Sequence, residues 1–191
     1  MIACLLFVVL QARPDGAGGG QVKQTAQARV PLARNLARDA AVVKAVQASN
    51  ALGEDLAAIM KKDHAWAHDS KLREEVLARP CSARLRELVR EDPFVVEALV
   101  MDERGALVCA TMATSDYWQG DEAKWQKTFQ QGLPAFIDEP ALDASAGVHG
   151  IQLSVPMAEG ERRIGAVTVT LKLRFGPGGV EAVKPARPPG R

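Results

Sequence analysis

The sequence has few aromatic residues, no excess of charge of either sign and no apolar run long enough to cross a bilayer. Aromatic side chains make up 5% of its 191 residues, and the formal net charge is +1. A near-neutral chain without aromatic rings interleaved with Lys and Arg lacks the features of a nucleic-acid-binding surface. With 47% hydrophobic residues the chain can still bury a core, and its length predicts one domain with short appendages.

Motifs for catalysis and metal binding are also missing. The sequence contains no P-loop, no zinc-finger spacing and no Ser-His-Asp order. Acids such as Asp116, Asp121 and Asp138 could act as acid and base, but no nucleophile can be paired with them. His64 and His68 lie one helical turn apart, yet no third metal ligand can be placed near them. The sequence therefore predicts no enzyme, no cofactor and no metal site.

The chain begins with the apolar run MIACLLFVVLQA, which is shorter than the roughly 20 residues that a membrane span needs. This run resembles the apolar part of a secretory signal, although no charged segment precedes it. We therefore expect residues 1–20 to be a signal-like segment with a Gly-rich linker. The protein would then be periplasmic or otherwise extracytoplasmic, either secreted or anchored by this run. The alternative is the irregular N-terminus of a cytosolic protein.

The three cysteines are Cys4, Cys81 and Cys109. Cys4 lies in the apolar run and leaves with it if a signal is removed. The other two could then form a disulfide in an oxidising compartment. Two buried free thiols are equally ordinary, so the sequence leaves the state of these two cysteines open.

Apolar residues at three- and four-residue spacing predict helices in the first half of the chain. The longest helix extends from about residue 21 to residue 48, and Pro31 either begins it or kinks it. A second helix is expected around Leu56 to Met60, and two shorter helices over residues 71–78 and 82–91.

β-branched residues dominate after Pro93. The runs 94–101 and 106–113, separated by a turn that ends at Gly105, predict a β-hairpin. Further strands are expected at residues 133–143, 150–156 and 163–173, with a short helix over residues 122–131 for which Asp121 is placed as the N-cap. Helices that precede strands predict an α+β fold with an antiparallel sheet of about five strands. Residues 21–173 form the single domain, and residues 174–191, rich in Pro and Gly, a disordered tail.

The stretch Thr114–Phe129, TSDYWQGDEAKWQKTF, concentrates rings and acids around Gly120. It holds the only Tyr of the chain, Tyr117, and two of its three Trp. Rings beside acids at a glycine turn can form a small-molecule pocket. The alternative is a loop whose rings cover the core while its acids face solvent.

This stretch and its flanking strands resemble the PDC/Cache class of extracytoplasmic sensor domains, which are PAS-like domains of bacterial histidine kinases and chemoreceptors. The resemblance spans about Val22 to Leu173 and is closest to stand-alone, exported members. It rests on the hairpin with its D-x-x-G turn, on SDYWQGDEAKW and on the strand IGAVTV. The resemblance implies a long N-terminal helix beside a PAS-like sheet, and a small-molecule ligand on one sheet face without catalysis.

The resemblance also implies which residues bind the ligand. They are Thr114, Ser115, Asp116, Tyr117, Trp118, Asp121, Trp125, Phe136, Asp138 and Gln152. The ligand would be an amino acid, an amine or a carboxylate-type metabolite. The Arg and His cluster of citrate- and dicarboxylate-sensing members is not visible, and acids in the pocket favour a ligand with an amino or other cationic group.

Two partners follow from the resemblance: a second copy of the chain, through the N-terminal helix, and a membrane-bound signalling protein. The alternative function is that of a structural or partner-binding protein, which dimerises through this helix and binds no small ligand.

Overall fold

The computed structural model describes residues 18–143, 148–176 and 179–182, so the predicted signal-like run lies outside it except for the end of its linker. Six helices precede the first strand: α1 (Gly18–Gln27), α2 (Val30–Arg38), α3 (Ala40–Leu52), α4 (Leu56–Trp66), α5 (Ser70–Ala78) and α6 (Pro80–Val89). The strands are β1 (Val95–Asp102), β2 (Leu107–Ala110), β3 (Phe136–Ile137), β4 (Ala141–Asp143), β5 (Val148–Glu159), β6 (Arg162–Gly176) and β7 (Gly179–Ala182). A short helix, α7 (Ala123–Trp125), continues into the π-helical turn η1 (Gln126–Gln130) between β2 and β3.

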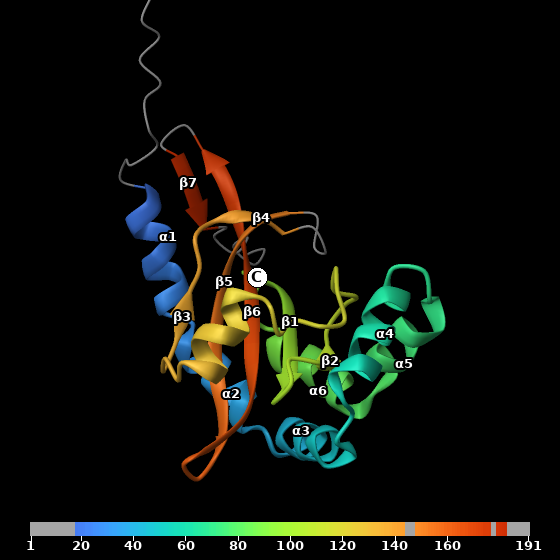
Figure 1. The fold of residues 1–191 in the computed structure, drawn as a ribbon. Coiled ribbons are helices and arrows are strands. Elements are labelled where there is room, and N and C mark those ends of the chain that lie inside the picture. The colour runs from blue at the N-terminus through green and yellow to red at the C-terminus, as the bar shows by residue number, and fades with distance from the viewer. Residues whose placement is uncertain (1–17, 144–147, 177–178, 183–191) are drawn as a thin grey trace, which may run out of the picture.

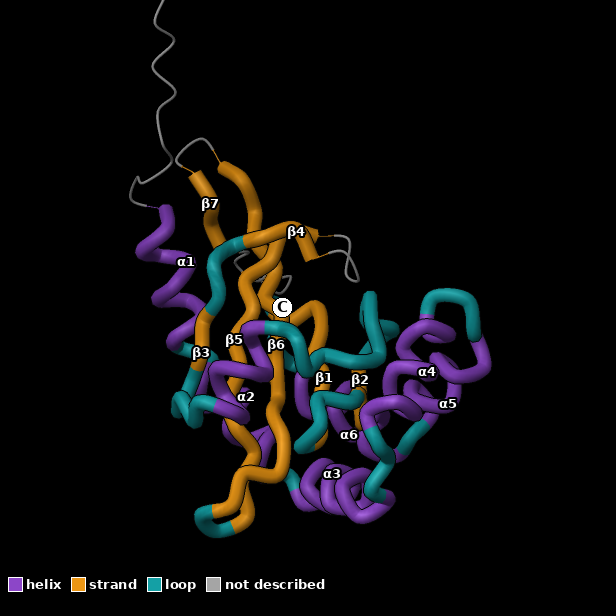
Figure 2. Tube along the Cα trace, viewed as in Figure 1, coloured by secondary structure: helices purple, strands orange, loops and turns teal. Residues whose placement is uncertain are grey.

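The order of elements confirms the predicted α+β fold. The central sheet has the order β2-β1-β6-β5-β3, with β4 paired to β5 and β7 paired to β6. Within the described ranges, all pairs of these strands are antiparallel. Figures 1 and 2 show the strands gathered in this one sheet, with α4 and α5 beyond the β2 edge and α1 near the opposite edge. No helix in the described ranges combines the length and the apolar character of a membrane span.

The predicted long N-terminal helix is interrupted twice, so α1, α2 and α3 follow one another as separate segments. Pro31 lies in the first turn of α2. A backbone N–H at this position has no acceptor within the helix, so the N–H that proline lacks is not needed. Asp39 adopts an extended conformation and caps α3, because its carboxylate accepts hydrogen bonds from the N–H groups of Ala41 and Val42. Arg84 of α6 binds the other oxygen of Asp39 at 2.9 Å, which holds this break against the next helix.

The end of the domain differs from the prediction. Strand β6 continues to Gly176, and the segment 179–182 pairs with it as β7, although a disordered tail was expected from residue 174. Strand pairing is made by backbone groups and needs no apolar periodicity, which explains why the side-chain pattern did not reveal it. Residues 183–191 lie outside the described residues.

Alternation along the strands divides the core between the two faces of the sheet. Ala98 and Val100 of β1 pack with residues of α1, α2, α3 and α6. Leu99 and Met101 point to the other face, where they join residues of α4 and the ring of Trp125. The sheet is therefore covered on both faces, by the first helices on one and by the central stretch on the other.

The hairpin turn depends on the side chain of Asp102 and on a glycine. The Asp102 carboxylate, which is 4% exposed, accepts hydrogen bonds from the N–H groups of Arg104 at 2.9 Å and Ala106 at 3.0 Å. Gly105 has a φ of 79°, a conformation that L side chains rarely adopt. A Cβ atom there would lie 2.5 Å from the Cα atom of Gly120. The D-x-x-G pattern thus fixes the turn and brings the central stretch against it.

We expect Gly105→Ala to lower the free energy of unfolding by about 3 kcal/mol or more, since it adds steric overlap to an unfavourable backbone conformation. Gly53→Ala is the matched control, because Gly53 also has a positive φ, of 63°, but nothing lies within 4 Å of its Cβ position. That variant should lose only about 1 kcal/mol. Urea unfolding followed by circular dichroism measures both, and equal losses would contradict the close approach to Gly120.

A disulfide joins Cys81 at the start of α6 to Cys109 in β2, across a sequence separation of 28 residues. Cys81 and Cys109 are 3% and 0% exposed. The sequence left open a disulfide or two free thiols, and the structure contains the disulfide. The bond anchors α6 to the edge strand of the sheet.

Replacing both cysteines by alanine should lower the free energy of unfolding by about 3–4 kcal/mol, because the crosslink closes a loop of this length in the unfolded chain. Chemical denaturation before and after reduction measures the effect. The double variant should be insensitive to reductant. A parent protein equally insensitive to reductant would mean that the bond contributes nothing.

Candidate ligand-binding site

A row of buried polar side chains crosses the middle of the sheet, on the face opposite α1, α2 and α3. Glu97 of β1, Thr168 and Thr170 of β6 and Ser154 of β5 are each 0–1% exposed. The strand register places Glu97 beside Thr170, and Ser154 beside Thr168. The Thr170 hydroxyl donates to the Glu97 carboxylate at 3.3 Å, and the Ser154 and Thr168 hydroxyl oxygens lie 2.8 Å apart. We call these four residues the polar row.

The local sequence explains why these groups share one face. In β6, Val167, Val169 and Leu171 alternate with the two threonines, so the apolar side chains meet the first helices and the hydroxyls meet the other side. Burying a carboxylate and three hydroxyls costs free energy unless polar partners surround them. Part of this need is met within the row, by the bonds from Thr170 to Glu97 and between Ser154 and Thr168.

Three of the ten predicted ligand-binding residues lie beside the polar row. Phe136 of β3 pairs with Ser154, and Gln152 of β5 pairs with Thr170. The Asp138 N–H donates to the Gln152 carbonyl at 2.9 Å, which holds the end of β3 against β5. All three side chains are partly exposed. This edge of the sheet therefore places one ring, one amide and one carboxylate next to the buried hydroxyls.

The aromatic rings of the central stretch are used as anchors. The indole N–H of Trp118 donates to the Arg104 carbonyl at 2.8 Å, and that of Trp125 donates to the Asp102 carbonyl at 3.0 Å. Trp125 also stacks on Phe129, with ring centroids 4.9 Å apart. Both indoles thus fasten the central stretch to the hairpin turn. This arrangement is the one expected of a loop whose rings cover the core.

The start of the central stretch is held by α4. Asp63 accepts hydrogen bonds from the N–H groups of Tyr117 at 2.9 Å and Trp118 at 2.8 Å. The indole N–H of Trp66 donates to the Thr114 carbonyl at 2.8 Å. In the sequence, the spacing of His64 and His68 was the only signal in this part of α4, and nothing there indicated the anchoring role of Asp63.

Three more of the predicted residues lie on the outside of the central stretch, whereas Thr114 is buried. Ser115, Asp116 and Asp121 are exposed. The Ser115 hydroxyl binds the Asp116 carboxylate at 2.7 Å, and the Thr114 hydroxyl donates to the Asp116 carbonyl at 2.7 Å. The N-cap position of α7 is occupied by Glu122 instead of Asp121, because the helix begins one residue later than expected. These acids face solvent, away from the polar row in the sheet.

Sequence reasoning missed the polar row itself. The signal was present in the alternation Val167-Thr168-Val169-Thr170, because residues two positions apart in a strand share one face and both hydroxyls therefore lie on the same side. Threonine is also an ordinary strand residue, so this pattern alone does not distinguish a site from a stable strand. Across the described ranges, no group of three His, Cys, Asp or Glu side chains is arranged to hold a metal ion.

No protein-family model matches this chain. No curated protein sequence matches it significantly either.

Solved structures similar to this chain include sensor domains and ligand-binding domains. The sensor domain of the V. cholerae histidine kinase DctB is 10% identical, with a TM-score of 0.45, over 80% of this chain and 51% of that one. The ligand-binding domain of the Pseudomonas fluorescens chemoreceptor CtaA, in complex with L-serine, is 11% identical, with a TM-score of 0.46, over 81% and 54%. The E. coli DcuS sensor domain is 14% identical, with a TM-score of 0.46, over 80% and 92%.

This chain spans about half the length of the DctB and CtaA domains. The similarity to the three domains is structural, at 10–14% sequence identity.

Asp63→Ala should lower the free energy of unfolding by about 2–3 kcal/mol, because two backbone N–H groups lose a charged acceptor. Asp121→Ala is the control, with an expected change within about 0.5 kcal/mol for an exposed side chain. Urea unfolding monitored by Trp fluorescence measures both variants. Equal stability of the two would show that the bonds from Asp63 do not hold the central stretch.

Proposed function

We propose that this chain is an extracytoplasmic sensor domain that binds a small molecule bearing an amino group over the polar row, without catalysing a reaction. The observation that carries the proposal is the burial of the Glu97 carboxylate among hydroxyl groups at the centre of a sheet face. A carboxylate in such surroundings attracts a cationic group more strongly than it would in water. The hydroxyls of Thr168, Thr170 and Ser154 offer further donors and acceptors for a polar ligand.

The neighbouring predicted residues fit the rest of such a ligand. Phe136 offers an apolar surface, Gln152 an amide and Asp138 a second carboxylate at the same edge of the sheet. An amino acid has an amino group, a carboxylate and a side chain, and these groups match the mixture of chemistry at this edge. We therefore place amino acids and simple amines first among the candidate ligands.

The proposed location outside the cytoplasm is supported by the disulfide between Cys81 and Cys109, since such bonds persist in oxidising compartments. In this proposal the domain reports ligand occupancy to a membrane-bound signalling partner. A second copy of the chain, joined through the N-terminal helices, is the other proposed partner.

The test is a thermal-shift screen of the whole chain against amino acids, amines and dicarboxylates. A ligand that binds only the folded state adds about 2.7 kcal/mol of stability at a hundredfold excess over its Kd. We expect a selective shift with one or more compounds that contain an amino group. A hit restricted to dicarboxylates would contradict the proposed ligand class.

Glu97→Gln should then weaken binding of the amine by about 10- to 100-fold, because a hydrogen bond between charged groups is lost. Glu91→Gln is the matched control, since the Glu91 side chain is 83% exposed and paired only with Arg90. Isothermal titration calorimetry measures both variants, and circular dichroism checks that Glu97→Gln is folded. Unchanged affinity in a folded Glu97→Gln protein would move the site away from the polar row.

A further inference from the structure

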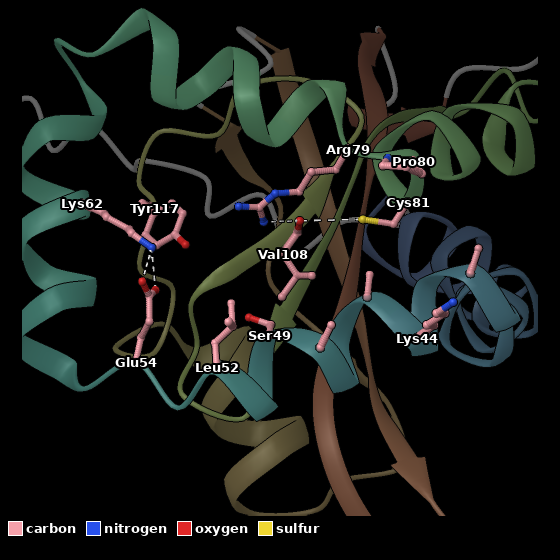
Figure 3. A pocket seen from close by; sticks show the side chains of 13 residues that line it. Lys44, Ser49, Leu52, Glu54, Lys62, Arg79, Pro80, Cys81, Val108 and Tyr117 are labelled. Atoms are coloured by element: carbon pink, nitrogen blue, oxygen red, sulfur yellow. Dashed lines mark hydrogen bonds and ion pairs between the residues drawn. The ribbon is translucent and has the colours of Figure 1, made fainter.

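A cavity of about 540 Å³ lies at the β2 edge of the sheet, between α3, α4 and the junction of α5 with α6 (Figure 3). One wall is the stripe of Ala41, Ala45, Ala48 and Leu52 along α3, at helical spacing. Pro80, Cys81 and Val108 form the apolar part of the facing wall. The size falls within the range of small-molecule pockets. Tyr117 is the only one of the ten predicted ligand-binding residues that lines it.

Tyr117 brings an unused polar group into this cavity. Its side chain is 3% exposed, and its ring packs against that of Trp66 with centroids 5.5 Å apart. Figure 3 shows the hydroxyl directed into the space between α3 and α4. Among the described residues, no hydrogen bond reaches this hydroxyl, whereas the backbone of Tyr117 is bonded to Asp63 and Leu107. Burial raises the pKa of Tyr117, so the hydroxyl is a hydrogen-bond donor at neutral pH.

Two cations, Arg79 and Lys62, lie close enough to Tyr117 to act on its charge, and so do the carboxylates of Glu54 and Asp102. Arg79 donates to the backbone carbonyls of Val108 at 2.7 Å and Leu107 at 3.4 Å, and no described carboxylate pairs with it. Its guanidinium extends toward Tyr117 (Figure 3). Lys62 is paired with Glu54 at 2.5 Å and lies 5.7 Å from the centroid of the Tyr117 ring. With the charge of Lys62 compensated by Glu54, the positive charge of Arg79 remains at this end of the cavity.

The α3 wall of the cavity runs from Leu52, near Glu54 and Tyr117, to Lys44 at its far end (Figure 3). Leu52 is 77% exposed, although it is a large apolar side chain on the cavity wall. Lys44, which is exposed, lies further along the same helix and adds positive charge at the rim. The cavity therefore combines apolar walls with a phenol and a guanidinium near Leu52 and an exposed ammonium group at the far end of α3.

We infer that this cavity is a second ligand site, for a small amphipathic carboxylate. The carboxylate accepts hydrogen bonds from the Tyr117 hydroxyl and pairs with Arg79, while the apolar body lies along the alanines of α3. Arg79 already points at the edge carbonyls of β2, so its guanidinium is held in place before a ligand arrives. This site needs a ligand of charge opposite to that proposed for Glu97, and it uses none of the polar row.

The test titrates the whole chain with sodium decanoate in a calorimeter, below the micellar concentration. Decanoate is expected to bind, and affinity should rise about threefold to fourfold for each CH₂ added from hexanoate to decanoate. Decylamine and decanol, which keep the apolar chain but lack the carboxylate, should bind at least tenfold more weakly. Equal binding of the three compounds would overturn the inference, because it would show that apolar contact alone is recognised.

Tyr117→Phe is the decisive variant, since it removes only the hydroxyl and keeps the ring against Trp66. Decanoate should bind about tenfold more weakly to it or worse. Ala48→Phe, which fills the cavity from α3, should abolish binding. Arg79→Met is less informative, because it also releases the β2 carbonyls.

Two controls separate this site from other effects. Arg90→Met removes an exposed guanidinium elsewhere on the surface and should bind decanoate as the parent does. Glu97→Gln should also leave decanoate binding unchanged, so failure of the amine site and failure of this site give different results. Unchanged affinity in a folded Tyr117→Phe protein would overturn the inference, and so would an absence of decanoate binding to the parent.

Discussion

The buried carboxylate of Asp102 is the point on which the hairpin, the third helix and the central stretch depend together. One oxygen accepts from the turn N–H groups of Arg104 and Ala106, and the other accepts from the Ser49 hydroxyl of α3 at 2.8 Å. Its backbone carbonyl receives the indole N–H of Trp125. A buried carboxylate is costly unless such bonds surround it. Because the bonds to the carboxylate come from the turn and from α3, the charge is fully bonded only when the hairpin and this helix are assembled.

Each of the three tryptophans joins two segments of the chain. Trp66, Trp118 and Trp125 all donate their indole N–H to backbone carbonyls of other segments. A ring that packs in the core and also makes a directed hydrogen bond fixes both the position and the orientation of the loop that it joins. Tyr117 differs from these three, since its backbone holds the loop while its hydroxyl stays unused. A residue whose polar group is not needed for the fold is available to a ligand.

Periodicity made most elements predictable, because a buried helix face or strand face requires apolar residues at fixed intervals. The hairpin with Asp102 and Gly105, the short helix before Phe136 and the last long strand were all expected close to where they lie. The candidate sites were harder to predict. Glu97 joins the hydroxyls of β6 only through strand register, and Arg79 meets Tyr117 only through the packing of helices at the sheet edge. Neither relation is local in sequence, so no short motif records it.

The two proposed sites lie on different parts of the same hairpin. Glu97 is in the first half of β1, while Val108 of β2 and Ser49, bound to Asp102, lie on the wall of the cavity. A ligand at either place therefore acts on strands that the turn at Asp102 holds together. Any coupling between the sites must act equally in both directions, because linkage of binding free energies is reciprocal. A rigid turn transmits such coupling only if the hairpin has two arrangements, and the close contact of Gly105 with Gly120 leaves little room for a second one at the turn. The geometry thus favours two ligands that bind independently, a cationic one at Glu97 and an anionic one in the cavity beside Tyr117.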